Sequence, residues 1–201
     1  MTPTPDIDSL ADRFASYLNR ELQHWTQDQA KKASPNGEVP SKMKVRVNLQ
    51  PDTRVRTPEE QALQIIAKRS WTCQSSHMSD RARHVPLIKN SKYVGKPKDM
   101  LTHEEYVFFA ATWTSALKKF GLRNYRGGDR FHPGDPYHVE LKNSKLPFDD
   151  PRVQACLERY AELTRKSGGP KNTAFEDSPK LKHIKDWLNV WEKNNKVRDK
   201  K

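Results

Sequence analysis

The chain has 201 residues, which fits one ordinary domain with appended elements and disfavours a multi-domain machine. Only 34% of the residues are hydrophobic, so we expect a small core. Lys and Arg number 37 against 25 Asp and Glu, a net charge of +12 that favours a polyanionic partner: nucleic acid, an anionic lipid surface or a bacterial cell wall. The net charge alone does not distinguish between these three kinds of partner.

Cysteine content and the N-terminal residues give expectations about the compartment. Cys73 and Cys156 are too few for a disulfide scaffold and have neither CxxC nor zinc-finger spacing, so a reducing compartment is expected. The first residues lack the basic and apolar regions of a secretory signal, and no stretch approaches the roughly 18 apolar residues of a membrane span. We therefore expect no signal peptide and no membrane span.

The first predicted element is an amphipathic helix over residues 8–28, where apolar side chains recur at steps of three and four. A linker follows it. Alternation of apolar and polar residues then predicts a half-buried strand over residues 42–49. Thr57, Pro58 and Glu60 predict the start of a second helix, because they supply an N-cap, a first-turn proline and a glutamate at N3.

The same capping pattern recurs at Thr102 and Glu105, and the helix that it opens has the strongest apolar stripe in the chain. Gly121 is placed to end this helix. Two further helices are expected toward the C-terminus, one from Pro151 and one from Pro179, with a basic tail after them.

Between these helices, residues 122–135 favour a loop because they are rich in Gly, Arg, Asp and Pro. Alternation over residues 137–141 predicts a short strand with His138 and Glu140 on one face. The whole pattern predicts an α+β fold with a small antiparallel sheet and packed helices.

The predicted organisation has three parts, in chain order. Residues 1–39 form an N-terminal amphipathic helix and linker, residues 40–145 a compact core, and residues 146–201 a C-terminal helical extension with the basic tail. The two end parts would cover the core or dock to a partner.

Three histidines, His77, His84 and His138, are the candidate metal ligands. Three neutral imidazoles suit a catalytic zinc ion (Zn²⁺), which takes three protein ligands and keeps a fourth position for water. Asp135 lies three residues before His138, where a carboxylate could act as the general base of a metallohydrolase. From spacing alone, the alternative that these are surface histidines of a basic chain stays open.

Four landmarks occur in order over residues 42–142, about half of the chain. They are Arg56-Thr57-Pro58-Glu59-Glu60-Gln61, Ser75-Ser76-His77-Met78-Ser79-Asp80-Arg81-Ala82-Arg83-His84, Gly127-Gly128-Asp129 and Asp135-Pro136-Tyr137-His138-Val139-Glu140-Leu141. Together they resemble the zinc D-Ala-D-Ala carboxypeptidase and L-Ala-D-Glu endopeptidase family, which includes phage endolysins and the vancomycin-resistance dipeptidases. The family pattern is an Arg that opens a Gln-containing helix, S-x-H-x-x-G-x-A-x-D, a Gly-Gly-Asp loop and [D/E]-x-x-H on a strand.

The resemblance implies that His77 and His138 bind zinc and that Asp135 is the catalytic base. Two residues depart from the pattern, since the family's Gly is Asp80 here and its metal-binding Asp is His84. A three-histidine site is still chemically sensible, because histidine is a good zinc ligand. Asp80 would need a positive φ if the family's glycine serves the backbone. Either change also fits a scaffold that has lost catalysis.

The resemblance also implies that Arg56 binds the peptide carboxylate or polarises the scissile carbonyl, with Gln61 and Ser75 as supporting residues. An arginine suits this role because its planar fork pairs with a carboxylate and stays charged. Without the resemblance, Arg56 is expected to be a solvated residue at a helix start.

The leading hypothesis is a zinc peptidase that cleaves peptidoglycan stem peptides. As a phage lysin or virion-associated hydrolase, it would lie in the host cytoplasm before lysis or in the virion, with peptidoglycan and other virion proteins as partners. The alternative is a non-catalytic virion structural protein, or a nucleic-acid-binding protein without sequence specificity, on a degenerate peptidase fold. The dispersed Lys and Arg residues show no helix-turn-helix or single-strand-binding signature, and the chain has no P-loop, GxSxG or HExxH motif.

Overall fold

The computed structural model describes residues 6–32, 41–47, 55–67, 69–70 and 72–166, together with Ile184, Asp186 and Asn189. The chain divides into two compact units: unit 1 comprises residues 1–54 and 80–144, and unit 2 comprises residues 55–79 and 145–201. Helices combine with small antiparallel sheets, so the predicted α+β class is confirmed. Among the described helices, none has the length and apolar content needed to cross a membrane.

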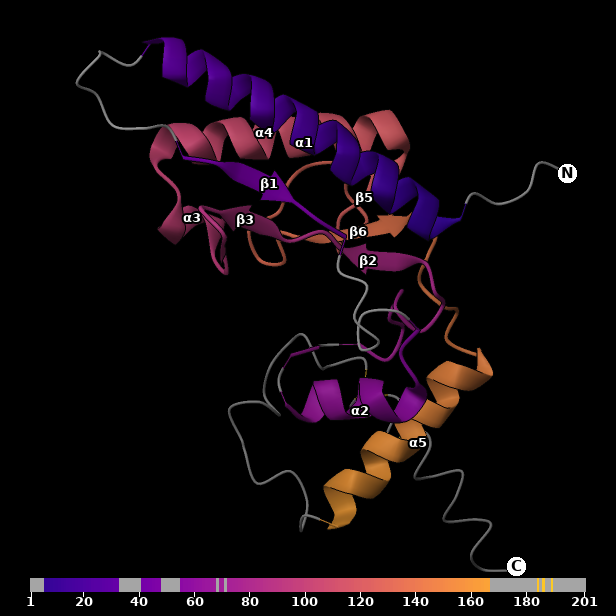
Figure 1. Ribbon diagram of the computed structural model, residues 1–201. Helices are drawn as coiled ribbons and strands as arrows, with labels where there is room; N and C mark the ends of the chain where they lie inside the picture. Colours follow the sequence, from indigo (N-terminus) through magenta and orange to yellow (C-terminus); the bar gives the residue numbers. More distant parts are fainter. Residues whose placement is uncertain are drawn as a thin grey trace, which may run out of the picture. The chain divides into compact units, whose positions relative to one another are not determined.

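Two long helices of unit 1, α1 (Ile7–Lys32) and α4 (His103–Phe120), pack along each other (Figure 1). The observed α1 extends a few residues beyond the predicted range. Phe14 of α1 and Trp113 of α4 are fully buried where the helices meet, with ring centroids 4.8 Å apart in an edge-to-face arrangement. This aromatic contact anchors the core of unit 1, which supports the candidate site.

The predicted ends of α4 are confirmed. The Thr102 hydroxyl accepts a hydrogen bond from the Glu105 backbone N–H, and the Glu105 carboxylate accepts one from the Thr102 backbone N–H. Gly121 ends the helix with φ 66°, a left-handed conformation that glycine adopts without strain. The short helix α3 (Pro97–Met100) precedes α4.

Within its described residues, unit 1 holds two three-stranded antiparallel sheets. The first has the order β1 (Met43–Val45), β3 (Leu87–Lys89) and β4 (Lys92–Tyr93), and the second has the order β2 (Ala82–His84), β6 (His138–Leu141) and β5 (Leu122–Arg123). The predicted strands at residues 42–49 and 137–141 are present as β1 and β6, although residues 48–49 lie outside the described residues. The prediction of a loop from residue 122 is wrong at its start, because β5 pairs there with β6.

Glu105 makes the stability of unit 1 depend on pH. Burial would raise the pKa of its carboxyl, but hydrogen bonds from the Lys89 ammonium, 2.6 Å away, and the Thr102 backbone outweigh burial and lower it below the ordinary value of 4.5. Because the pKa is lower in the folded state, the stabilisation is present above the unfolded-state pKa and is lost as the pH falls through the folded-state pKa.

We therefore expect Glu105→Gln to lower the free energy of unfolding at neutral pH and to flatten its decline between about pH 5 and pH 3. Urea unfolding followed by circular dichroism at several pH values measures both effects. Equal pH dependence in the variant and the wild type would contradict this account of Glu105.

Unit 2 is built on α2 (Pro58–Ile66) and α5 (Pro151–Lys166), which pack against each other. The predicted capping box of α2 is present, with the Thr57 hydroxyl accepting from the Glu60 N–H and the Glu60 carboxylate accepting from the Thr57 N–H. Ile65 of α2 and Leu157 of α5 are fully buried. Most of the helix predicted from Pro179, the N-terminal linker and the basic tail lie outside the described residues.

The two cysteines meet in the core of unit 2. The Sγ atoms of Cys73 and Cys156 lie 2.9 Å apart, and both residues are buried. The hydrogen bond between them and burial raise the pKa of the Cys73 thiol, so the folded protein holds little of the reactive thiolate. Their proximity is not visible in the sequence, where they lie 83 positions apart.

We expect glutathione disulfide, added during refolding, to oxidise this pair: each thiol loses a proton and an electron, a Cys73–Cys156 disulfide forms, and glutathione disulfide is reduced to two thiols. The cross-link should stabilise the chain by about 2–4 kcal/mol. Alkylation of free thiols under denaturing conditions, read by intact mass, counts them, and Cys156→Ser is the control. Two alkylatable thiols after oxidative refolding would contradict the prediction.

Candidate metal centre

Pairing of β2 with β6 brings two of the predicted ligands together. His84 ends β2, His138 begins β6, and the antiparallel register places them directly opposite each other. Their ring centroids lie 5.5 Å apart with the rings nearly perpendicular. Residues opposite each other in an antiparallel pair of strands have neighbouring side chains. Strand pairing therefore explains why the side chains of residues 84 and 138 lie next to each other.

Asp135, the predicted general base, lies close to both histidines. One carboxylate oxygen is 3.7 Å from Nε2 of His84, and the other is 3.7 Å from Nδ1 of His138. The Asp135 side chain is 39% exposed, so water and a solute can reach it. An accessible carboxylate beside two imidazoles is a suitable arrangement for accepting a proton.

The second nitrogen of His138 has a different carboxylate partner. Nε2 of His138 lies 3.1 Å from Oε2 of Glu140, and both side chains are buried. Glu140 shares the strand face of His138, as predicted from their two-residue spacing. When Nε2 carries the proton and donates it to Glu140, Nδ1 presents its lone pair on the Asp135 side, the arrangement common among metal-ligating histidines.

Asp80, which stands where the family pattern has glycine, adopts the predicted left-handed conformation with φ 56°. Its carboxylate lies 2.7 Å from the guanidinium of Arg83, whose side chain is almost fully buried. Asp8 of α1 accepts two further hydrogen bonds from Arg83, at 2.7 and 3.0 Å. Asp80 is therefore held in this conformation by a buried arginine immediately before His84 on the same strand.

The predicted residues of unit 2 are also brought together. The Arg56 guanidinium donates to the Gln61 side-chain oxygen at 2.7 Å, and the Arg56 backbone N–H donates to the carbonyl of His77. The Ser75 hydroxyl accepts from the backbone N–H of His77. Gln61 is fully buried and itself donates to Ser70, so Arg56 is held by a fixed amide and is not the solvated residue of the alternative interpretation.

Two of the candidate ligands, His84 and His138, lie together in unit 1 and could share a metal ion; His138 is buried and His84 is partly buried. The third candidate, His77, is a buried residue of unit 2. Imidazole suits zinc, copper, iron and nickel, so this ligand set does not identify the metal. His132, another residue that the sequence placed near the site, does not belong to this set. Its ring packs edge-on against Tyr125, and its Nδ1 accepts a hydrogen bond from the Gly134 backbone.

The Gly-Gly-Asp landmark has a local structural explanation. The side-chain oxygen of Asn124 accepts hydrogen bonds from the backbone N–H groups of Arg126 and Gly128, and Gly127 has φ 78°. A Cβ atom on Gly128 would lie 3.1 Å from the Asn124 amide nitrogen. Both glycines therefore serve the shape of the loop.

A cavity of 540 Å³ in unit 1 opens beside His84 and Asp135. Arg46 supplies a cation to its wall, and Tyr93 supplies a ring that is 60% exposed. Burial, and then the charge of Asp135, raise the pKa of the Tyr93 hydroxyl, so it remains a hydrogen-bond donor. The sequence did not predict Arg46 or Tyr93 as site residues, because neither belongs to a motif. Tyr93 reaches the cavity through the pairing of β4 with β3, and Arg46 directly follows β1, where its backbone N–H donates to the Pro86 carbonyl.

Searches against protein-family models and curated protein sequences find no match to the chain. The resemblance to the zinc peptidases therefore stays a prediction that depends on the ordered landmarks of the sequence.

Proposed function

We propose that the chain is a zinc-dependent peptidase that cleaves the stem peptides of bacterial peptidoglycan at an L-Ala-D-Glu or D-Ala-D-Ala type bond. One observation carries the proposal: His84 and His138 lie directly opposite each other on paired strands, with the Asp135 carboxylate 3.7 Å from a nitrogen of each. Two imidazoles and an accessible carboxylate suit a hydrolytic metal site better than a purely structural one.

Each residue has a role in this proposal. His84 and His138 would hold the ion, the sequence assigns His77 as the third ligand, and Glu140 fixes the ring of His138. When bound, zinc would lower the pKa of the attacking water and polarise the scissile carbonyl. Asp135 accepts the proton of that water and passes it to the leaving amine.

Two further groups of residues bind the substrate in this proposal. The cavity beside Asp135 receives the peptide, and Arg46 on its wall pairs with a peptide carboxylate. Arg56, oriented by Gln61, is the second arginine of the proposal and binds a carboxylate or the scissile carbonyl.

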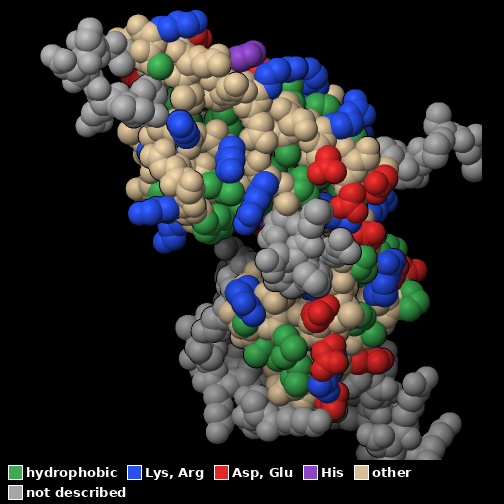
Figure 2. All heavy atoms as spheres, in the orientation of Figure 1, with side chains coloured by type: hydrophobic (Ala, Val, Ile, Leu, Met, Phe, Trp, Pro, Cys, Tyr) green, Lys and Arg blue, Asp and Glu red, His purple; other side chains and the backbone are tan. Residues whose placement is uncertain are grey.

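The positive charge fits a protein that works at an anionic wall. Figure 2 shows Lys and Arg side chains spread over the visible face and not gathered into one stripe. A dispersed basic surface favours adsorption to a polyanion without recognition of a sequence. We therefore propose a phage lysin or virion-associated hydrolase, present in the host cytoplasm before lysis or in the virion.

Digestion of purified peptidoglycan tests the proposal. The full chain with added zinc should release stem-peptide fragments. Mass spectrometry identifies these fragments, and their new termini show which bond was cleaved. A chelator should abolish the release and an excess of zinc should restore it. Intact peptidoglycan after prolonged incubation with zinc would contradict the proposed activity and favour the non-catalytic virion protein.

A further inference from the structure

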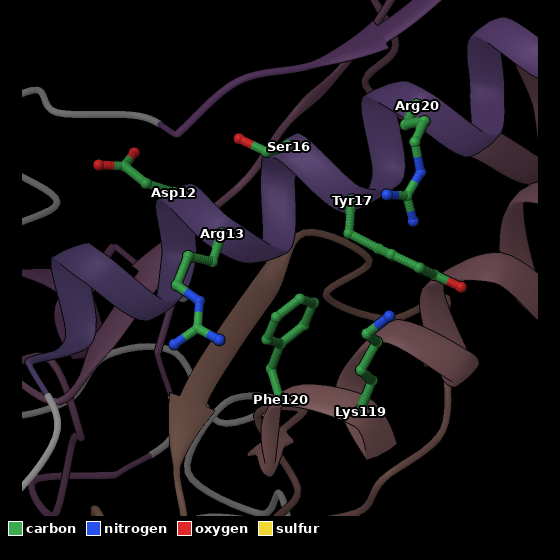
Figure 3. Close-up of a pocket in the computed structure, with 7 residues that line it drawn as sticks. All are labelled: Asp12, Arg13, Ser16, Tyr17, Arg20, Lys119 and Phe120. Atoms are coloured by element: carbon green, nitrogen blue, oxygen red, sulfur yellow. The ribbon is translucent and has the colours of Figure 1, made fainter.

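A second concave surface of unit 1 lies away from the histidines, between α1 and the C-terminal end of α4. It has a volume of 350 Å³ (Figure 3). Three cationic side chains border it, Arg13 and Arg20 from α1 and Lys119 from α4, around the half-buried rings of Tyr17 and Phe120. The proposed peptidase uses none of these residues.

The aromatic rings hold the cationic groups in place. The Arg13 guanidinium lies over the Phe120 ring at 5.6 Å from its centroid. Arg20 lies over the Tyr17 ring at 5.3 Å, and the Lys119 ammonium lies over the same ring at 4.5 Å. Cation–π contacts restrict these long side chains, so a ligand would lose less side-chain entropy on binding them.

Carboxylates neutralise this group of cations only in part. Arg20 pairs with Glu21 at 3.1 Å, but no carboxylate among the described residues lies within ion-pair distance of Arg13 or Lys119. Asp12 borders the pocket, yet its side chain points away from the three cations in Figure 3. The local charge is therefore positive and suits an anion.

A purely structural role for the three cations explains the pocket less well than anion binding does. Lys119 in the last turn of α4 is favourable for the helix dipole, and that explains one cation. It does not explain why Arg13 of α1 lies over Phe120 of α4, or why Arg20 and Lys119, from different helices, lie over the same Tyr17 ring. Phosphates separated along a flexible strand can reach several cations at once, and cations interleaved with aromatic rings are the usual surface for single-stranded nucleic acid.

We propose that this pocket, the α1–α4 pocket, binds the phosphate backbone of single-stranded nucleic acid without sequence preference. Arg13, Arg20 and Lys119 contact phosphates, and the exposed parts of Tyr17 and Phe120 contact sugar or base. This binding is independent of the peptidase activity, because the pocket shares no residue with the metal centre.

Fluorescence anisotropy with a labelled oligothymidylate tests the proposal on the full chain. The double variant Arg13→Gln/Lys119→Gln should bind at least about 10-fold more weakly at low salt, and the slope of log K against log salt should fall by about one to two. The matched control is Lys32→Gln/Lys118→Gln, which removes the same charge from the same two helices but leaves the pocket intact.

Equal losses in the pocket and control variants would overturn the proposal, because the binding would then depend on total charge. A pocket-dependent interaction with purified teichoic acid, but not with the oligonucleotide, would also overturn it and identify a wall polymer as the ligand. Lys119→Gln alone, with its circular dichroism melt compared with the wild type, shows whether any loss reflects misfolding.

Discussion

Replacing Asp135 with asparagine should lower kcat for stem-peptide cleavage by about 100- to 10,000-fold, the range typical of a lost general base. Asparagine keeps the shape of the side chain but cannot accept a proton. Asp135 is not one of the three proposed ligands, so the zinc content should stay the same. Cleavage of a soluble stem peptide, followed by chromatography, gives kcat and KM.

The matched control for this variant is Asp99→Asn, an exposed aspartate of α3 that should leave kcat unchanged. Wild-type activity in Asp135→Asn would show that Asp135 is not the base. Loss of zinc together with activity would show that Asp135 is itself a ligand, and the assignment of roles would be wrong.

The second large effect concerns His84, the position where the family pattern has a metal-binding aspartate. His84→Ala should weaken zinc binding by more than about 100-fold, because even residues that only orient ligands contribute 10- to 100-fold. His84→Asp should retain measurable affinity, because a carboxylate can replace imidazole as a zinc ligand. Competition with a coloured zinc chelator measures both affinities.

His103→Ala is the control, since His103 is the first residue of α4 and belongs to no proposed site. Equal zinc affinity in the wild type and in His84→Ala would contradict the ligand role of His84. A loss in His84→Asp as large as in His84→Ala would show that the strand geometry accepts only histidine.

Local signals in the sequence predicted the two long helices of unit 1, α1 and α4, but not the four-residue helix α3. Thr102, Glu105 and Gly121 set the ends of α4 through contacts within a few residues, and such contacts leave a readable pattern. The strands β2 to β4 have only two or three residues each, too few for a period-two pattern to show. The pairing of β5 with β6 depends on residues distant in the chain, so residues 122–123 were predicted as loop.

The candidate site was predicted in part. The landmarks identified His84, Asp135 and His138 as chemically suitable, but the register that sets His84 opposite His138 appears only in the fold. Tyr93 reaches the neighbouring cavity through the pairing of β4 with β3, Arg46 directly follows β1, and neither residue belongs to a motif. The sequence did not predict the α1–α4 pocket either, because its cationic side chains come from two helices about 100 residues apart in the chain.

Metal analysis of the full chain, purified without added metal, tests the central claim most directly. The proposed site predicts close to one equivalent of zinc in the wild type and its loss in His138→Ala, whose ring lies between Asp135 and Glu140. Less than about half an equivalent in the wild type, with no further loss in His138→Ala, would contradict the metal centre and the peptidase built on it.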